Sequence, residues 1–226
     1  MIDVNSKILD EKEANNVLSK VYTRMFFGIM VTALVAAISS RSESFLYFSQ
    51  SGFLFLAIAE IAVSLIFSFC FMKLSSTAVT ILFYIYAVLT GLSFSSIFIA
   101  FDLNSVFGLF LVTALIFGIM AILGRTSKAN LSNLGSILFA SLIAGLVLTF
   151  INLFMRNSFV DIVVDWIMLA IFMGYTAYDV QNISNLLSYS GIDEEHLYTY
   201  GAMQLYLDFI NIFIRLLSIF GRRRDS

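Results

Sequence analysis

The sequence predicts an all-α integral membrane protein, a bundle of seven transmembrane helices. Of its 226 residues, 60% are hydrophobic and only 12% are charged, and the mean hydropathy is +0.93. Soluble domains usually contain about 25% charged residues. The length accommodates about seven spans of roughly 20 residues with short connections, so no room remains for a separate soluble catalytic domain.

Seven apolar runs, each bounded by charged or turn residues, predict the spans. Each is expected to be helical because lipid cannot satisfy free backbone polar groups, and none shows the alternation of a barrel strand. The chain contains no proline, so we expect fairly continuous helices. The runs are Val21–Ser39, Gly52–Met72, Thr77–Ala100, Val106–Leu123, Leu134–Met155, Phe159–Asn182 and Tyr198–Phe220.

Polar and basic residues predict the chain's orientation and its three regions. Residues 1–20 form a short cytoplasmic tail without a cleavable signal peptide, 21–220 the transmembrane domain, and 221–226 a basic carboxyl tail. The positive-inside rule places the amino terminus in the cytoplasm. The arginines at 222–224 favour a cytoplasmic carboxyl end, with a last segment that returns instead of crossing. The amino-terminal side carries Lys7, Lys12, Lys20, Arg24, Lys73, Arg125 and Lys128, against Arg41 and Arg156 opposite.

Two acids lie within apolar segments, Asp179 in GYTAYDVQNI and Asp208 in GAMQLYLDFINIFIRLL. An ionised Asp at bilayer depth costs roughly 2.5 to 3.5 kcal/mol, so intramembrane acids are usually functional. Asp179 lies about nine residues before the predicted hairpin turn and Asp208 about twelve after it, so their depths differ by less than ~5 Å. The two carboxyl groups are therefore expected to meet.

Two chemistries fit such a pair. Two carboxyl groups in a poorly hydrated bundle cannot both ionise cheaply, so they tend to share one proton and to act as a pH sensor. Alternatively, their oxygens, with Asn182, Asn211 and backbone carbonyls, suit a hard cation such as Ca²⁺. Protons and Ca²⁺ would then compete for one site.

A structural role remains an alternative, in which Asp179 sits near a helix end and Asp208 pairs with Arg215. A third acid, Glu60, either pairs with Arg215 or lines the same path as the two aspartates. The last segment carries four polar residues on one helical face, so it is expected to be enclosed by other helices, as a central or re-entrant element. These four are Gln204, Asp208, Asn211 and Arg215.

Several classes of protein are excluded. A single cysteine, Cys70, rules out a disulfide and a multi-thiolate metal site, and the absence of a basic face argues against nucleic-acid binding. The last segment lacks a lysine for retinal, and the one histidine, His196, lies in a predicted, exposed hairpin turn, unlike the histidine of a rhomboid protease. Tyr178 and Asp179 match the first motif of intramembrane aspartyl proteases, but LYLD lacks the glycines of the second. No enzymatic activity and no resident cofactor are expected.

Four stretches together resemble the Bax inhibitor-1 family, also called the transmembrane Bax inhibitor motif family, and look like its bacterial inner-membrane members. The match covers nearly the whole chain. The stretches are KVYTRMFFGIMVTALVA, LSSTAVTILFYIYAVLTGLSFSSIF, IFMGYTAYDVQNI and GAMQLYLDFINIFIRLLSIFGRRR.

The resemblance implies six helices around a central seventh, with Asp179 and Asp208 as a di-aspartyl proton sensor and ion pathway of a calcium leak. It implies a multi-pass protein of the bacterial inner membrane, whose partners are the lipid bilayer, protons and Ca²⁺. Some bacterial relatives are associated with a membrane-bound AAA protease, so a non-conducting regulator of such a protease is the alternative function. Relatives commonly carry a basic residue ten positions after the second Asp, where this chain has Ser218; Arg215 lies one turn earlier on nearly the same face.

Overall fold

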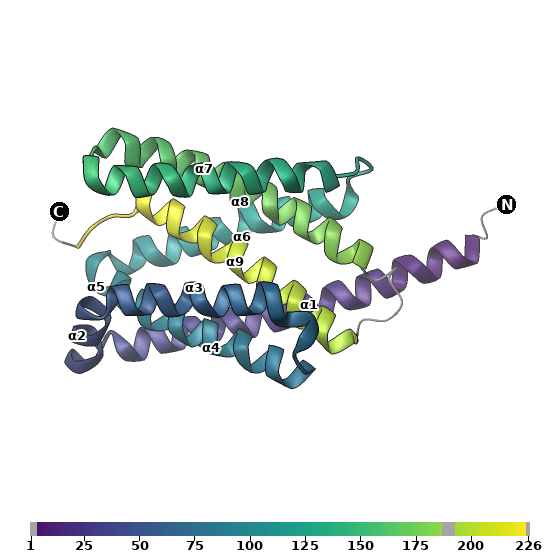
Figure 1. Cartoon of the computed structure of the whole chain (residues 1–226), viewed down its shortest axis with the longest axis horizontal. Helices are drawn as coiled ribbons and strands as arrows, with labels where there is room; N and C mark the ends of the chain where they lie inside the picture. Colours follow the sequence, from purple (N-terminus) through teal and green to yellow (C-terminus); the bar gives the residue numbers. More distant parts are fainter. Residues whose placement is uncertain (1–3, 187–192, 225–226) are drawn as a thin grey trace. The chain divides into compact units, whose positions relative to one another are not determined.

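The computed structural model describes residues 4–186 and 193–224, and these residues are almost entirely helical (Figure 1). Ser188 and Gly191 of the predicted hairpin turn lie outside the described residues. The described elements are α1 (Val4–Ser39), α2 (Glu43–Ser51), α3 (Phe53–Cys70), the 3-10 helix η1 (Phe71–Lys73), α4 (Ser76–Phe94), α5 (Ile97–Ala100), α6 (Leu103–Thr126), α7 (Ser132–Met155), α8 (Ser158–Leu186) and α9 (Glu194–Phe220).

Six helical stretches among the described residues are long and apolar enough to cross a membrane, which confirms an all-α, multi-pass membrane protein. The second predicted span is a shorter apolar helix, Leu54–Cys70. The count of seven spans therefore stays a prediction. The six stretches are Asn15–Ser39, Ser76–Ala100, Leu103–Thr126, Ser132–Met155, Ser158–Asn185 and Glu194–Phe220.

The expectation of continuous helices is wrong for the third predicted span. The helix is interrupted between α4 and α5, at Ser95 and Ser96. Each serine hydroxyl donates a hydrogen bond to the carbonyl three residues earlier, at 2.6 Å for Ser95 and 3.0 Å for Ser96. Hydroxyls that bind nearby backbone carbonyls compete with the helical ladder. Two adjacent serines thus interrupt the helix in the absence of proline.

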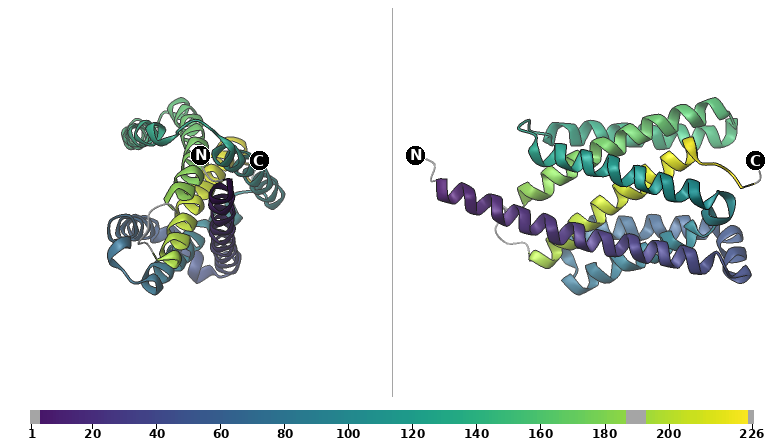
Figure 2. Two further views of the ribbon diagram at one scale, coloured as in Figure 1. Left: turned by 90° about the vertical axis from the view of Figure 1, so that its right-hand side faces the viewer. Right: turned by 180° about the vertical axis from the view of Figure 1, so that it is seen from behind.

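The first compact unit comprises the described residues of Met1–Asp102, Ile183–Tyr206 and Arg223–Ser226. Within it α4 packs against both α1 and α3. The amino-terminal part of α1 projects beyond α3 and α4 (Figure 2). The helix is continuous from Val4 through the predicted boundary at residue 20, and Val21 is fully buried.

The second compact unit comprises Leu103–Asn182 and Leu207–Arg222. Helices α7 and α8 lie side by side and are joined by a tight turn (Figure 1). Arg156 ends α7 in the left-handed conformation, with φ 51°. The unit's core is apolar and draws on α7, α8 and the second half of α9. Its buried members are Leu138, Val164, Met168, Leu169, Ile171, Phe172, Ile212 and Leu216.

Helix α9 runs in the same direction as α4. It begins beside the start of α4, where His196 Nε2 lies 2.7 Å from the carbonyl oxygen of Leu74. The chain after α9 ends beside α5, where the amide of Arg224 donates to the carbonyl of Ala100 at 3.0 Å. The returning last segment and the cytoplasmic carboxyl end stay predictions.

Helix α9 is also the most buried of the six candidate spans, with 56% of its most apolar window inside the protein. The polar face of α9 predicts that other helices enclose it. In open lipid, the favourable transfer free energy of its apolar residues would barely offset the cost of Asp208 and its three polar neighbours. Its placement at the centre of six others stays a prediction.

Candidate functional site

Two buried carboxyl groups meet in the second unit. Asp179 lies on α8 and Asp208 on α9, and their side chains are only 7% and 3% exposed. The two carboxyl groups lie next to each other and interact. The hairpin count predicts this contact, because antiparallel helices bring residues equally far from their turn to one level.

Neighbouring carboxyl groups attract each other when one of them carries a proton, because a protonated carboxyl can donate a hydrogen bond and an ionised carboxylate can only accept one. Thr176 lies beside Asp208, and its hydroxyl donates to the carbonyl of Phe172 at 2.9 Å. One oxygen of Asp208, Oδ2, is buried and has no hydrogen-bond partner among the described residues. An unmatched buried acceptor is costly, so a proton or a cation at this oxygen would be stabilising.

Close helix packing fixes α8 just before Asp179. A Cβ atom at Gly124 of α6 would lie 2.2 Å from the carbonyl oxygen of Ala177. A Cβ atom at Gly135 of α7 would lie 2.6 Å from the ring of Tyr178. Only glycine permits such approaches. Three helices therefore pack tightly at the level of the acid pair.

Gln181, two residues after Asp179, holds the connection between α6 and α7. Its Oε1 accepts from the amide of Leu131 at 2.7 Å, and its Nε2 donates to the carbonyl of Ala129 at 2.9 Å. The sequence analysis did not single out this residue. A glutamine near a predicted helix end can indicate a contact with a neighbouring loop, because its side-chain amide can bind both a backbone N–H and a backbone carbonyl.

Arg215 binds a carboxylate that the sequence analysis overlooked. Its guanidinium lies 2.6 Å from Oδ1 of Asp165 on α8, and the hydroxyl of Ser218 donates to Oδ2 of the same side chain. The predicted pairing of Arg215 with Asp208 is therefore wrong, and its pairing with Glu60 stays a prediction. Asp165 follows Asp161 in FVDIVVDW, near the start of a predicted span. Acidic residues are common in the first turn of a helix, so the sequence gives no reason to expect an ion pair at Asp165.

Ser218 occupies the position at which the family resemblance implies a basic residue. In this chain Ser218 and Arg215 bind one carboxylate together. The basic group is thus supplied one turn earlier, and the hydroxyl satisfies the remaining oxygen. The two residues lie on one face of α9 because they are three positions apart.

The other candidate residues form local contacts. Glu60 accepts a hydrogen bond from Ser93 at 2.5 Å. Gln204 donates to the hydroxyl of Tyr200 at 3.1 Å, and Asn211 donates to the carbonyl of Leu207 at 2.8 Å. Asn182, three residues after Asp179, is half-buried. The amide groups of Gln204 and Asn211 therefore bind their own helix.

Metal ligation by the acid pair would need further oxygen atoms. Among the residues that the structure describes, no three His, Cys, Asp or Glu side chains are grouped to hold one ion. Ca²⁺ takes six to eight oxygen ligands, whereas the two carboxyl groups of Asp179 and Asp208 supply four at most. The remainder would have to be backbone carbonyls or water.

His196 is not exposed, contrary to the sequence-based expectation. Its side chain is 13% exposed. Nδ1 lies 3.0 Å from the hydroxyl of Ser76, and Nε2 lies 2.7 Å from the carbonyl oxygen of Leu74. The expectation failed because α9 begins at Glu194, so that His196 falls in the first helical turn and faces α4.

Asp193 shares the hydroxyl of Ser76, which donates to its carboxylate. This hydrogen bond, together with the nearby imidazole of His196, lowers the pKa of Asp193 below its ordinary value of 3.8. The side chain lies outside the candidate spans and is 58% exposed. The contact joins the segment before α9 to the start of α4.

Comparison with known proteins identifies the family. The family model described as "Inhibitor of apoptosis-promoting Bax1" matches residues 14–225. The chain belongs to the Bax inhibitor-1 family. The match spans both compact units, so the family assignment covers the acid pair as well as the α1, α3 and α4 packing.

Named relatives of this Bax inhibitor-1 protein are bacterial. "Inner membrane protein YbhL" of Escherichia coli K12 is 39% identical over 214 residues, which cover 92% of each chain. An "Uncharacterized protein" of Deinococcus radiodurans is 35% identical and covers 97% of this chain and 94% of its own. A further "Uncharacterized protein", from Borreliella burgdorferi, is 32% identical over the full length of both.

Proposed function

We propose that this Bax inhibitor-1 protein is a pH-sensitive calcium leak of the bacterial inner membrane, gated by Asp179 and Asp208. The observation that carries the proposal is the contact between two buried carboxyl groups. Together with the unpartnered Oδ2 of Asp208, this contact provides a site for either a proton or a cation.

The shared proton holds the closed state. With one carboxyl protonated, the hydrogen bond joins α8 to α9 at this level. Loss of that proton leaves two negative charges in contact away from bulk water, which is strongly unfavourable. The helices then separate or a cation enters. Protonation thus shifts the balance between two arrangements of the same helices.

Ca²⁺ competes with the proton for the same oxygens. A divalent cation between two carboxylates removes their repulsion and completes its coordination with backbone carbonyls and water. Low pH therefore favours the proton and the closed pair. In the proposed orientation the amino terminus is cytoplasmic, following the positive-inside rule.

Ca²⁺ flux into proteoliposomes tests the proposal. We expect flux to rise between pH 6 and pH 8 in the wild type, and we expect the double variant Asp179→Asn, Asp208→Asn to lose this pH dependence. Asn resembles a protonated carboxyl in shape but has no charge to titrate. Glu43→Gln, at an exposed acid in α2, is the matched control. An unchanged flux and pH response in the double variant would exclude the sensor role.

A further inference from the structure

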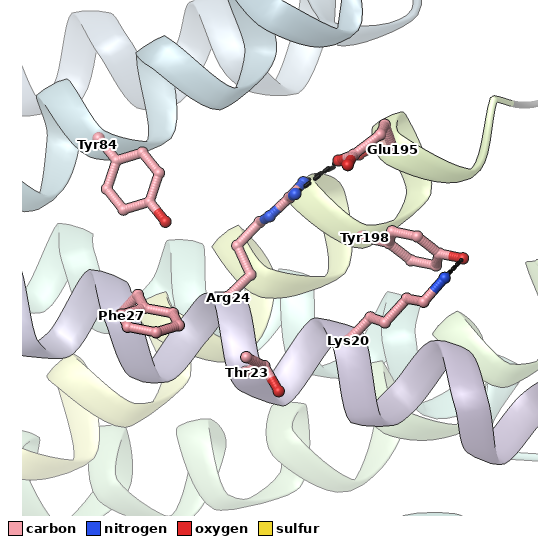
Figure 3. A pocket seen from close by; sticks show the side chains of 7 residues that line it. All are labelled: Lys20, Thr23, Arg24, Phe27, Tyr84, Glu195 and Tyr198. Carbon is pink, nitrogen blue, oxygen red and sulfur yellow. Dashed lines mark hydrogen bonds and ion pairs between the residues drawn. The ribbon is translucent and has the colours of Figure 1, made fainter.

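A pocket of about 350 Å³ opens in the first unit between α1, α4 and α9 (Figure 3). Four residues of α1 line it, together with Tyr84 of α4 and with Glu195 and Tyr198 of α9. Polar groups form one end of the pocket, and the rings of Phe27 and Tyr84 lie toward the other (Figure 3). This pocket is separate from the residues of the acid pair.

Each of the two basic residues that line the pocket has an acidic neighbour. Lys20 and Arg24, one helical turn apart on α1, face a single lining acid, Glu195. The guanidinium of Arg24 lies 2.6 Å from Oε2 of Glu195. The ammonium of Lys20 lies 3.0 Å from the hydroxyl of Tyr198 and 3.8 Å from the carboxylate of Glu194. Its side chain is 48% exposed, so the ammonium remains accessible to an incoming anion.

An exposed apolar stripe continues from the pocket along α1. Phe27, Met30 and Leu34 are 54%, 41% and 56% exposed. With Lys20 and Arg24 they follow helical spacing and so lie on one face. A cationic, hydrogen-bonding end followed by an apolar stripe matches a molecule with an anionic head and a hydrocarbon tail.

We propose that this pocket binds the phosphate headgroup of an anionic phospholipid, with an acyl chain along the stripe of α1. The ammonium of Lys20 pairs with the phosphate, and Arg24 is shared between the phosphate and Glu195. The hydroxyl of Tyr84 supplies a further hydrogen-bond donor. Basic pockets between transmembrane helices are a recurrent site for such headgroups.

The two basic residues determine which lipid is preferred. A zwitterionic headgroup brings a cationic amine that Lys20 and Arg24 repel. A phosphatidylglycerol headgroup has only its phosphate charge, which takes the place of Glu194 as the partner of Lys20. A soluble phosphate lacks the chain that covers Phe27 and Met30, so it gains nothing from the apolar stripe.

Native mass spectrometry of the full-length protein in detergent tests the proposal, with phosphatidylglycerol and phosphatidylcholine of identical acyl chains. We expect preferential retention of phosphatidylglycerol and about fivefold weaker retention in Lys20→Gln, the loss typical of one basic residue near an anionic lipid surface. Lys73→Gln removes an exposed lysine outside the lining and should retain the lipid as the wild type does. Equal retention of the two lipids would overturn the proposal.

Competition with a soluble phosphate and a charge-conserving variant distinguish lipid binding from binding of a free anion and from loss of structure. Excess glycerol 3-phosphate should not displace the lipid; if it does, the site binds a free anion and the lipid proposal fails. Lys20→Arg should restore retention because it restores the charge. If Lys20→Gln unfolds, Tyr84→Phe provides the second measurement, with reduced retention of phosphatidylglycerol expected and unchanged retention counting against the headgroup contact.

Discussion

Helices α8 and α9 are joined by two polar contacts of opposite electrostatic character. Asp165 and Arg215 form an ion pair, with 2.6 Å between carboxylate and guanidinium. Asp179 and Asp208 bring two acids together. The ion pair is attractive when both groups are charged, whereas the acid pair is attractive only when it holds a proton or a cation.

Under the proposed function, this difference confines the pH-dependent change to the end of the interface that holds the acid pair. Asp165 and Asp179 are fourteen residues apart, about 21 Å along α8. Changes between pH 6 and pH 8 should therefore loosen the helices around Asp179, while the contact of Asp165 with Arg215 persists as a fixed point. A permeation path that opens near Asp179 would be a local change of this kind.

Breaking the ion pair should have the largest effect on stability. Arg215→Met leaves Asp165 charged, 11% exposed and without its partner. We expect a loss of about 3 kcal/mol, because removing one member of a buried pair leaves an uncompensated charge. Thermal unfolding in detergent measures it. Arg41→Met, at an exposed arginine, should change little.

A second variant distinguishes the contribution of the ion pair to stability from that of the packing of the Arg215 side chain. Adding Asp165→Leu to Arg215→Met should recover most of the loss, since two apolar residues need no compensation. If the double variant is as unstable as the single one, the contact stabilises the protein through packing rather than charge.

A methyl group at Gly124 should disturb the helix packing beside Asp179 and Asp208 and leave the contact of Asp165 with Arg215 unchanged. Its Cβ atom would lie 2.2 Å from the backbone of Ala177, so α6 or α8 must move. We expect Gly124→Ala to cost about 2 kcal/mol. In the same helix, a Cβ atom at Gly118 meets nothing within 4 Å, and Gly118→Ala should stabilise by up to about 1 kcal/mol. Equal effects of the two substitutions in thermal unfolding would contradict the close approach.

The pH dependence of stability should come from the acid pair. In the proposed function the folded pair shares a proton that the unfolded chain releases, so wild-type stability should fall as pH rises from 6 to 8. The change is on the order of 1 kcal/mol, since one proton per pH unit corresponds to about 1.4 kcal/mol. Asp208→Asn should abolish this slope in chemical unfolding. A slope that persists in this variant would assign the pH dependence to other groups.

Asp193 should have the smallest effect on stability, and its contribution should increase with pH, whereas that of the acid pair decreases. The folded-state pKa of Asp193 is lowered, mainly by the hydroxyl of Ser76, so its ionised form stabilises the fold above its ordinary pKa of 3.8. This contribution is lost as pH falls through the lowered value. Asp193→Asn should reduce the unfolding temperature slightly at pH 7 and not at pH 3. A difference of the same size at both pH values would show that charge is not involved.

Sequence reasoning located the helical segments and the acid pair because both depend on local or one-dimensional information. Apolar runs are long enough to identify spans, and equal distances from one hairpin turn place Asp179 and Asp208 at one level. The same reasoning could not find the partner of Arg215. That choice depends on how α8 and α9 are rotated about their axes, and hydropathy does not specify this rotation.

His196 and Glu60 show the same limit. His196 was placed in an exposed turn because its neighbours are polar, yet an earlier start of α9 turns it toward Ser76. Glu60 has Ser93 as its hydrogen-bond donor, a residue that carries no signal of its own in the sequence. Both contacts join segments that are distant along the chain, so nothing in the local pattern could predict them.

The amino-acid sequence alone determined that this chain is a helical membrane protein of the Bax inhibitor-1 type with two interior aspartates at one depth, because burial in lipid restricts backbone and charge so strongly. The tertiary structure decided which charges are neutralised and which are not. Asp165 and Ser218 complete the contact of Arg215, and Oδ2 of Asp208 is buried without a hydrogen-bond donor from the described part of the chain, because helix rotation and close packing at Gly124 fix which side chains can meet.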